Sequence, residues 1–469
     1  MAFGSVAWTV CLLVLIVCRE TQAAGDTEYD SGIITSDVCI IGGGSGGTYS
    51  AIRLRQHGKR VTVVEKEAIL GGHVNTYTDP VTGLTLDYGV IIFDNISVVT
   101  NYFNYFDVPL GPIGDLFVST QLFADFTTGE AVSASIFPSG NTTGAALLAY
   151  NDQLSKYPFL INGYNLPFPV PADLLITWGD FLKKYQLEGL AYTAFTFIQG
   201  VGNILAQPTL YIMKYFAQST VQNILTNGFL TTVRHNNHEL YDKALVELGS
   251  NALVSSNVTR IVRNYDGVEV TVSTPSGTKL IKASKLLIAI QPKLESLSFL
   301  DLDVEEQSLF GQFNNSYYWD ALIRNPGFPA NISISNVDPS APFALPPMPG
   351  IYGIDSTTIP DIYTAYYSSP YALSEEYVKA DILATTARIV KAAGYPPVNG
   401  TPEFVGFNDH RPFELTVSTD AIRDGFYDRL NDLQGKQRTW WTGATWQAHD
   451  SSLIWNWTEY NILPGLLAN

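Results

Sequence analysis

The residues that first suggest chemistry are three glycines after an apolar run near the N-terminus. Gly42, Gly44 and Gly47 have the spacing Gly-x-Gly-x-x-Gly, and Glu65 ends the next apolar run. In a dinucleotide site the first glycine permits a tight turn, the second lets the backbone approach a pyrophosphate, and the third lets a helix pack closely. The acidic residue accepts hydrogen bonds from ribose hydroxyls and repels a 2′-phosphate, which disfavours NADP. The pattern predicts a dinucleotide site made by Gly42, Gly44, Ser45, Gly46, Gly47 and Glu65.

The elements that must position this site are a strand, a helix and a second strand. Residues 37–41 are continuously apolar, as in a buried parallel strand, and residues 60–65 are expected to form a second buried strand. Between them, residues 48–57 are expected to form a helix that ends at Gly58. The N-terminus of this helix offers N–H groups and a positive dipole end to phosphates.

A second pair of glycines distinguishes between flavin and nicotinamide cofactors. Gly71-Gly72-His73 and the segment Leu-Asp-Tyr-Gly-Val at 86–90 resemble flavin-containing amine oxidase-like proteins. The resemblance implies that the chain at Gly71, Gly72 and His73 passes close to the pyrophosphate of FAD. His73 stands where many flavin amine oxidases have an arginine. FAD is therefore the expected cofactor.

Three later segments extend the resemblance to the rest of the cofactor. Residues 257–261 resemble the strand whose backbone meets the adenine, which implies a contact at Val258. Residues 287–292 resemble the strand that leaves the FAD domain. Residues 441–444 resemble the C-terminal turn that touches the ribityl chain and the flavin ring, here at Gly443 and Ala444.

Within that superfamily the sequence is most similar to the β-cyclopiazonate dehydrogenase (oxidocyclase) family of fungal flavoproteins. The similarity spans about residues 36–467 and is carried by Gly-Gly-His-Val-Asn-Thr-Tyr-Thr-Asp (71–79), Gly-Phe-Tyr (425–427), Leu-Gln-Gly (433–435) and Trp-Thr-Gly-Ala (441–444). It implies an α/β fold, with a two-part Rossmann-type FAD-binding domain and an interleaved α+β substrate-binding domain. It also implies FAD-dependent oxidation, often with ring closure, of apolar secondary metabolites such as prenylated indole alkaloids or terpenoids.

Few catalytic side chains are expected, because a flavin performs the redox step itself. His73, His410 and His449 are candidates to tune the flavin, act as a base or bond covalently to the flavin ring, with an ordinary hydrogen-bonded role as the alternative. Lys293 resembles the lysine that bonds a flavin-site water in amine oxidases. Hydride removal leaves a cation that aromatic faces stabilise. Five tryptophans fit either such a cage or the packing of a buried helix: Trp440, Trp441, Trp446, Trp455 and Trp457.

One segment invites a metal interpretation. His235-Asn-Asn-His238-Glu239 brings together residue types that bind zinc. Its order matches neither the zincin motif nor the inverted one. We expect no metal and assign the segment to a solvated loop.

Changes in residue composition along the chain predict how it is divided into domains. Segments rich in Pro, Tyr and Phe fill about 95–237. Short strands are then expected at 252–256, 258–262, 268–272 and 286–290, with a turn at 275–277. A helix is expected from about 450 to 463. The predicted division is a signal peptide (1–23), three FAD-binding parts (34–93, 241–295 and 431–469) and two substrate-binding parts (94–240 and 296–430).

The composition and the N-terminal segment indicate which binding partners and which cellular compartment to expect. The net charge of -17 disfavours nucleic acid. The apolar run 6–18, followed by Thr21-Gln22-Ala23, is typical of a signal peptide cleaved after Ala23, with an uncleaved anchor as the alternative. We find no other run that could cross a bilayer, so no stable membrane span is expected after cleavage. The sequons, which fit a glycosylating compartment, begin at Asn95, Asn141, Asn257, Asn314, Asn331, Asn399 and Asn456.

The cysteines agree with that compartment. Cys11 and Cys18 leave with the signal peptide, so Cys39 has no partner for an intramolecular disulfide. We expect a protein that is secreted or held in the lumen of the secretory pathway. It would act on a small molecule, with molecular oxygen as a candidate electron acceptor.

Other functions fit parts of this pattern. A flavin amine oxidase that releases hydrogen peroxide shares the cofactor and differs only in its pocket, and a non-catalytic FAD-binding protein shares the fold. A nicotinamide-dependent dehydrogenase is disfavoured because only one nucleotide fingerprint is present. The match of Gly43-x-Ser45-x-Gly47 to the nucleophile elbow of α/β-hydrolases is disfavoured because that elbow follows several earlier strands.

Overall fold

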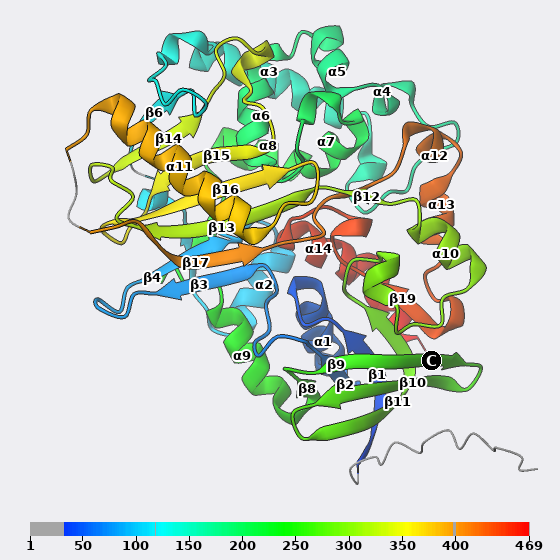
Figure 1. The fold of residues 1–469 in the computed structure, drawn as a ribbon. Helices are drawn as coiled ribbons and strands as arrows, with labels where there is room; N and C mark the ends of the chain where they lie inside the picture. Colours follow the sequence, from blue (N-terminus) through cyan, green and yellow to red (C-terminus); the bar gives the residue numbers. More distant parts are fainter. Residues whose placement is uncertain (1–31, 118, 397–399, 469) are drawn as a thin grey trace, which may run out of the picture.

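The computed structural model describes residues 32–117, 119–396 and 400–468. The expected signal peptide and the sequon at Asn399 lie outside these ranges. Within them, no helix is both long enough and apolar enough to cross a membrane. Two layers are stacked in Figure 1, and helix α14 (Ser451–Trp457) lies between them.

The lower layer is a seven-stranded sheet drawn from three distant stretches of the chain (Figure 1). Its order is β8-β2-β1-β11-β10-β9, with β19 beside β11. The strands are β1 (Ile33–Ile41), β2 (Val61–Val64), β8 (Ala252–Leu253), β9 (Asn257–Asn264), β10 (Gly267–Thr274), β11 (Gly277–Ile288) and β19 (Thr439–Trp441). The strands β8, β2, β1, β11 and β19 pair in parallel, as expected for a Rossmann-type sheet. All three stretches were assigned to the FAD-binding domain, and the domain limits themselves stay predictions.

Helix α1 (Ser45–Gln56) follows β1 and begins earlier than the predicted residues 48–57. The difference arises at the glycines, which were read as a loop but form the first turn of the helix. A Cβ atom on Gly47 would lie 1.9 Å from the carbonyl oxygen of Gly42. Only glycine therefore lets α1 start so close to the end of β1.

Strand β8 covers two residues rather than the predicted 252–256. The chain leaves the sheet because the amides of Ser255 and Ser256 donate to the carbonyl oxygens of Glu67 and Glu65, at 2.7 and 2.8 Å. It then enters an antiparallel meander of β9, β10 and β11, in which Pro275 and Ser276 form the expected turn. Strand β11 is longer than predicted, beginning at Gly277 and ending at Ile288.

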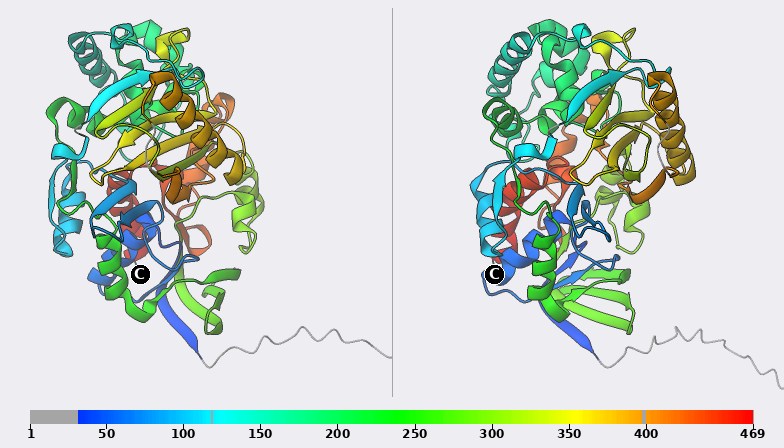
Figure 2. Two further views of the ribbon diagram at one scale, coloured as in Figure 1. Left: turned by 60° about the vertical axis from the view of Figure 1, so that its left-hand side comes forward. Right: turned by 90° about the vertical axis from the view of Figure 1, so that its left-hand side faces the viewer.

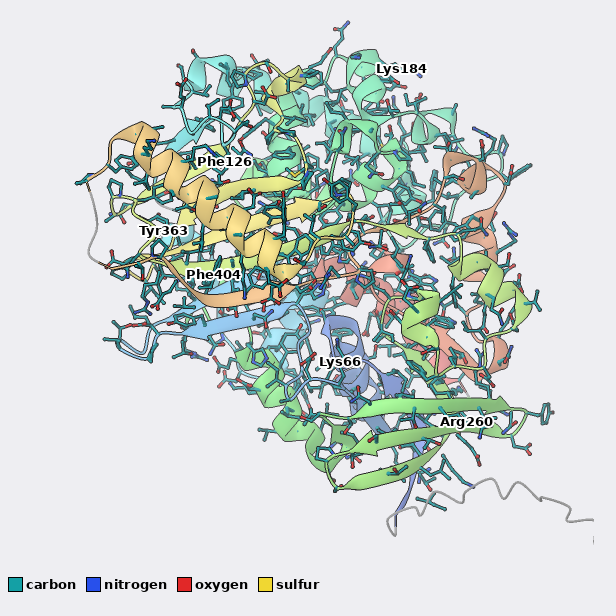
Figure 3. The ribbon with its side chains drawn as sticks, in the orientation of Figure 1. Lys66, Phe126, Lys184, Arg260, Tyr363 and Phe404 are labelled. Atoms are coloured by element: carbon teal, nitrogen blue, oxygen red, sulfur yellow. The ribbon has the colours of Figure 1, made fainter. Side chains whose placement is uncertain are left out.

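The upper layer contains a six-stranded mixed sheet, and its strand β13 contacts β4 (Thr85–Gly89), which pairs with β3 (Val74–Thr78). Its order is β17-β13-β16-β15-β14-β6, and helix α11 (Glu375–Ala393) lies across one face (Figures 1 and 2). The strands are β6 (Thr120–Ala124), β13 (Tyr317–Arg324), β14 (Ile332–Asn336), β15 (Gly350–Ser356), β16 (Ile362–Ser369) and β17 (Glu403–Asp409). Phe126 and Tyr363 belong to the core between α11 and this sheet, and Phe404 packs against it (Figure 3).

Helices fill the rest of the upper layer and the junction. Those that matter for the site are α2 (Ser97–Tyr105), α7 (Thr209–Tyr215), α9 (Glu239–Leu248) and α13 (Phe426–Asn431). The helix predicted at 450–463 is confirmed: α14 continues through a π-helical turn, Thr458–Ile462, into α15 (Leu463–Leu467). This C-terminal helix packs against α1 and α2, so the end of the chain is held beside the first glycine turn.

Residues 235–238 form a loop, as predicted, but the loop is not fully solvated. Asn237 is fully buried, and its amide donates to Asp87 Oδ1 at 2.8 Å. His238 Nε2 lies 2.8 Å from the carbonyl oxygen of Leu70, next to the second glycine pair. These polar groups satisfy buried backbone and side-chain atoms, which periodicity in the sequence does not reveal. Across the described residues, no group of three or more His, Cys, Asp or Glu side chains is arranged to hold a metal.

Candidate functional site

The two glycine segments meet backbone to backbone. The amide of Gly71 donates to the carbonyl oxygen of Gly43 at 2.8 Å, and Gly44 forms a bridge with Gly71. A Cβ on Gly72, which has a φ of +58°, would lie 3.0 Å from the Cα of Gly44. No side chain can stand between the two segments, and together they form a cradle lined by backbone.

The cradle lies at the N-terminus of α1. In the part of the chain that the structure describes, no side chain caps this helix, whose N-cap residue is Gly44. Its first N–H groups and its positive dipole end are therefore available to an anion. A Cβ on Gly44 would have only the Cα of Gly72 nearby, at 3.8 Å. The cradle fits a pyrophosphate group of a dinucleotide.

Glu65 lies beside this turn and is 9% exposed. Its two carboxylate oxygens accept the amides of Gly43, at 2.6 Å, and Glu67, at 2.8 Å. Each oxygen keeps further acceptor capacity for a ribose hydroxyl. The chain that leads to Val258 also passes here, because Ser256 donates to the Glu65 carbonyl oxygen.

The C-terminal turn approaches the cradle from the other side. Gly443 has a φ of +114°, and a Cβ there would meet nothing within 4 Å. The preceding residue, Thr442, donates its amide to the carbonyl oxygen of Ile288, and its methyl group would lie 3.4 Å from a Cβ on Gly46. Gly443 and Ala444 therefore start a turn that lies next to α1 and faces open space.

Three histidines that are far apart in the sequence converge beyond Gly72. The ring centroid of His73 lies 4.2 Å from that of His410 and 6.2 Å from that of His449. The ring of Phe413 stacks on His449 at 3.9 Å, and Tyr318 lies 5.0 Å from Phe413. We call His73, His410 and His449 the histidine cluster. It joins the glycine cradle to the upper layer.

His410 is held by a carboxylate that the sequence reading missed. Its Nε2 donates to Oδ2 of Asp320 at 2.7 Å, and Asn408 donates to Oδ1 at 2.7 Å. Asp320 is fully buried in β13. The bond fixes the orientation of the imidazole and leaves Nδ1 for a second partner. A charged residue within the apolar run 317–323 was the signal that could have revealed Asp320.

His449 lies beside a second missed carboxyl group. Its Nε2 is 3.8 Å from Oε2 of Glu414, and both side chains are buried. Burial raises the pKa of Glu414 to about 8, although Lys214 opposes that shift, and burial lowers the pKa of His449 to about 3. Near neutral pH the carboxyl group is protonated and the imidazole is neutral.

Lys214 is a third missed residue. It is 2% exposed, and burial lowers its pKa well below the usual value. Its Nζ donates to the carbonyl oxygens of Leu160 and Gly163, at 2.8 and 3.0 Å, and to Oε1 of Gln447, at 2.5 Å. Because Gln447 lies two residues before His449, Lys214 anchors the turn that carries this histidine.

The remaining candidates have structural contacts. Lys293 donates to the carbonyl oxygen of Phe313 at 2.8 Å, away from the histidine cluster. Ser45 contacts the hydroxyls of Ser451 and Tyr241 rather than a histidine, which argues against a nucleophile elbow. Asp79, at the end of the segment 71–79, accepts Arg324 at 2.8 Å and so ties the β3–β4 hairpin (Val74–Thr78 and Thr85–Gly89) to β13.

The tryptophans pack the core rather than form a single cage. Trp455 stacks on Tyr49 and Phe93, at 5.7 and 5.6 Å, and donates to the carbonyl oxygen of Ser45. Trp441 and Trp446 stack on each other at 5.8 Å. Trp455 therefore packs the C-terminal helix against α1 and α2.

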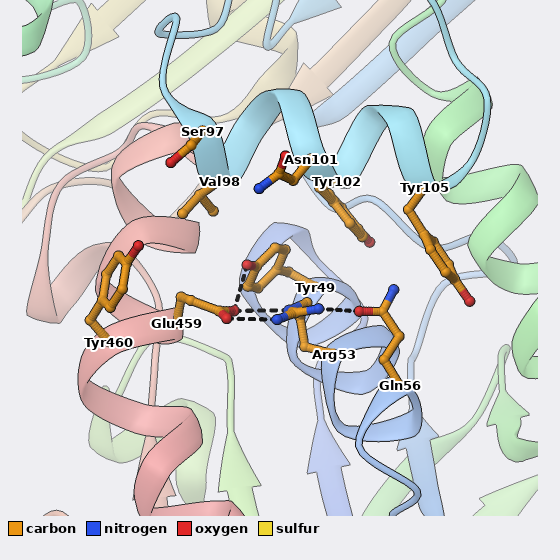
Figure 4. A pocket seen from close by; sticks show the side chains of 10 residues that line it. All are labelled: Tyr49, Arg53, Gln56, Ser97, Val98, Asn101, Tyr102, Tyr105, Glu459 and Tyr460. Atoms are coloured by element: carbon orange, nitrogen blue, oxygen red, sulfur yellow. Dashed lines mark hydrogen bonds and ion pairs between the residues drawn. The ribbon is translucent and has the colours of Figure 1, made fainter.

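A surface pocket of about 120 Å³ lies between α1, α2 and the π-helical turn (Figure 4). Glu459 crosses it and accepts Tyr49 at 2.7 Å and two nitrogens of Arg53 at 2.9 and 2.7 Å. Its lining includes no residue of the cradle or of the histidine cluster. This ion pair fastens the C-terminal helix to α1.

Comparisons with known proteins agree with this geometry. Residues 40–107 match the family model described as an NAD(P)-binding Rossmann-like domain. The FAD-dependent oxidoreductase oblC of Cochliobolus heterostrophus is 40% identical, with 99% of this chain and 98% of that protein covered. Beta-cyclopiazonate dehydrogenase of Aspergillus oryzae is 36% identical, with 91% of this chain and 92% of that protein covered.

Solved structures show the same fold. A CLA-producing fatty acid isomerase from P. acnes superimposes with a TM-score of 0.74 at 19% identity, covering 92% of this chain and 98% of that one. A variant of putrescine oxidase gives a TM-score of 0.65 at 14% identity, covering 92% and 100%. Both likenesses extend over the two layers.

The sheet, the glycine cradle and these relatives define an FAD-dependent oxidoreductase with an amine oxidase-like fold. The chain belongs to the family of FAD-dependent oxidoreductases that includes beta-cyclopiazonate dehydrogenase. The fold class, the cofactor and the enzyme class expected from the sequence are thereby confirmed. The residue-level assignments stay predictions.

We expect the folded protein to lose stability as the pH rises from 6.5 to 8. Burial raises the pKa of Asp87 to about 7 and of Glu414 to about 8, so the folded state keeps protons that the unfolded state releases above about pH 4. The lowered pKa values of His73 and His449 oppose this only below about pH 6.5, and the lowered pKa of Lys214 opposes it within the range, so comparison with Glu414→Gln isolates the contribution of Glu414. Thermal unfolding across this range should show a falling melting temperature, with a shallower slope in Glu414→Gln. A melting temperature that rises with pH in both proteins would contradict the assignment.

Proposed function

We propose that the protein uses FAD to take a hydride from a small apolar metabolite of the prenylated alkaloid or terpenoid type. The resulting cation is trapped within the same molecule, which closes a ring. The observation that carries this proposal is the histidine cluster, which lies among aromatic rings at the end of the glycine cradle. The name of the relative beta-cyclopiazonate dehydrogenase supports the substrate class.

In this proposal the cofactor follows the two glycine segments. Gly42, Gly44, Ser45, Gly46 and Gly47 hold the pyrophosphate with the start of α1, and Glu65 accepts the ribose hydroxyls. Val258 meets the adenine. Gly71, Gly72 and His73 pass close to the pyrophosphate, and Gly443 and Ala444 touch the ribityl chain and the flavin ring.

Bound FAD supplies an acceptor for two electrons and a hydrogen. The chain itself supplies a site partly shielded from water, because His410 and Phe413 are buried and His73, Tyr318 and Tyr215 are half-buried. Phe413, Tyr318 and Tyr215 present rings near the cluster, and aromatic faces stabilise a cation formed in the substrate. Asp320 holds His410 in one orientation. Molecular oxygen as the final acceptor and a covalent bond between a histidine and the flavin are still predictions.

The substitution Gly44→Ala tests the cradle. The backbone of Gly44 is extended, at φ -69° and ψ -167°, and its Cβ would meet no atom closer than 3.8 Å, so the protein should fold normally. The methyl group would occupy the place proposed for the pyrophosphate. We expect affinity for FAD to fall by about tenfold or more, measured by flavin fluorescence during titration of flavin-free protein.

The control is Gly140→Ala, at the start of α3 (Gly140–Leu154), where a Cβ meets nothing within 4 Å. It should leave the affinity for FAD unchanged. Equal affinities in the two variants and the parent protein would show that the pyrophosphate does not lie against Gly44.

Anaerobic reduction tests the substrate class. We expect β-cyclopiazonate, or another member of a panel of prenylated indoles and terpenoids, to bleach the absorption of the bound flavin, while putrescine does not. Bleaching by putrescine alone would assign amine oxidation. A flavin that no compound of the panel bleaches, but that dithionite does, would point to a binding protein without turnover.

We also propose that the chain passes through the secretory pathway and is glycosylated. Five sequon asparagines in the described residues are exposed: Asn95, Asn141, Asn257, Asn314 and Asn331. Asn456 differs, because it is half-buried and its side-chain amide donates to Asn162 at 2.9 Å. An oligosaccharide there would have to break this contact.

Mass spectrometry of the protein from a fungal secretory host, before and after removal of N-glycans, checks this assignment. We expect glycans at exposed sites and none at Asn456. An unmodified protein, or a glycan confined to Asn456, would contradict it.

A further inference from the structure

Glu414 and His449 bring a buried carboxyl group next to an imidazole. The two side chains come from different segments, Glu414 from the chain entering β18 (Leu415–Thr416) and His449 from the turn before α14. Their nearest atoms, Oε2 and Nε2, are 3.8 Å apart. The neighbour of Glu414 in the sequence, Phe413, stacks on the His449 ring at 3.9 Å and fixes its plane.

Glu414 forms no ion pair with a lysine or arginine in the described residues, although the nearby Lys214 lowers its pKa. In the described part of the chain, no lysine or arginine lies within 4.0 Å of its oxygens. The nearby Lys214 directs its ammonium group to three other oxygens. The titratable groups that face Glu414 are otherwise His449 and four tyrosine hydroxyls, of Tyr164, Tyr211, Tyr215 and Tyr427.

His449 connects this carboxyl group to the rest of the site. One face of the ring contacts Phe413, and the ring lies parallel to that of His73 at 6.2 Å between centroids. Because Nε2 is the atom near Glu414, Nδ1 is the atom left to meet another group. The imidazole therefore lies between a buried carboxyl group and the histidine cluster.

We propose that His449 and Glu414 form a proton relay for the oxidation. The proposal rests on the function proposed above. Bound FAD would supply the hydride acceptor, and oxidation would also release a proton from an N–H or O–H group of the substrate when the double bond or the new ring bond forms. Nδ1 of His449 accepts this proton, the proton on Nε2 moves to the ionised carboxylate of Glu414, and the imidazole stays neutral throughout.

The energetics of the two groups agree with this direction. A neutral imidazole with a pKa of about 3 is a poor final acceptor, whereas a carboxylate with a pKa of about 8 retains the proton at neutral pH. The separation of 3.8 Å is longer than a hydrogen bond, and catalytic contacts of this kind tighten when substrate binds. Glu414 acts through His449, so its test needs a readout that a purely structural carboxyl group would not change.

The first readout is the absorption spectrum of the bound flavin, titrated from pH 6 to pH 10 without substrate. We expect a transition with a midpoint near 8 in the parent holoenzyme, because the charge on Glu414 changes near the flavin. Glu414→Gln should lack this transition, and His449→Gln should keep it. The matched control is Asp355→Asn on β15, since burial also raises the pKa of Asp355, to about 6, but its partner is Ser333.

The second readout is the rate of anaerobic bleaching by β-cyclopiazonate. In the parent protein and in Asp355→Asn, the rate should rise about tenfold per pH unit below 8 and then level. Glu414→Gln should be roughly 100-fold slower at pH 8.5 and independent of pH, and His449→Gln should be slowed to a similar extent. A Glu414→Gln protein that keeps both the spectral transition and the rising limb would overturn the proposal.

The outcomes separate this proposal from the proposed function. A preparation without flavin, or one that no substrate bleaches, contradicts the function. If flavin is bound but not bleached, the spectral titration still reports on Glu414, and if no flavin is bound, infrared spectroscopy of the protein does. If Glu414→Gln does not fold, infrared spectroscopy of the parent holoenzyme tests whether Glu414 carries a proton. The band of a protonated carboxylic acid should disappear with a midpoint near pH 8, and its absence at pH 6 would refute the relay.

Discussion

The backbone contact between Gly43 and Gly71 is the constraint on which the rest of the structure depends. A hydrogen bond of 2.8 Å joins two segments that follow different strands, and their glycines exclude every side chain from the space between them. A buried backbone amide must be paired, so this bond also fixes the path of the loop after β2. His73 follows that loop directly. The position of the first histidine is thus set by the same contact that shapes the cradle.

The second constraint is the burial of ionisable groups where the two layers meet. Asp320, Glu414 and Lys214 are each almost inaccessible to water. Buried groups of this kind are tolerated when they are hydrogen-bonded or neutral, and both solutions occur here. Asp320 is bonded to His410 and Asn408, whereas Glu414 keeps its proton. The arrangement gives the site one fixed histidine and one group that can exchange a proton.

The part of the fold that could be predicted from the sequence is the part encoded by contiguous residues. The strand at 37–41, the glycine turn and Glu65 lie within one short stretch, and each residue type has a local reason to be there. The C-terminal helix followed from its apolar pattern in the same way. The limits of α1 and β8 were wrong because they depend on contacts with distant backbone, such as that between Ser256 and Glu65.

The catalytic surroundings could be predicted only in part. The three histidines were found as candidates because they lie in segments that resemble flavoproteins, but their convergence depends on the packing of both layers. Asp320 is 90 residues from His410 in the chain, and no local pattern links them. Lys214 reaches Gln447 across 233 residues. The segment at 235–239 was assigned to solvent because its polar residues look exposed, although Asn237 is buried and His238 lies against the second glycine pair.

The most direct test of the cradle compares the binding of FAD and FMN to the protein prepared without flavin. FMN lacks the adenosine half and the second phosphate group, so it cannot occupy the cradle, Glu65 and the segment at Val258 together. We predict that FAD binds more tightly than FMN by on the order of 100-fold or more. Equal affinities for FAD and FMN would show that the glycine segments do not grip the pyrophosphate.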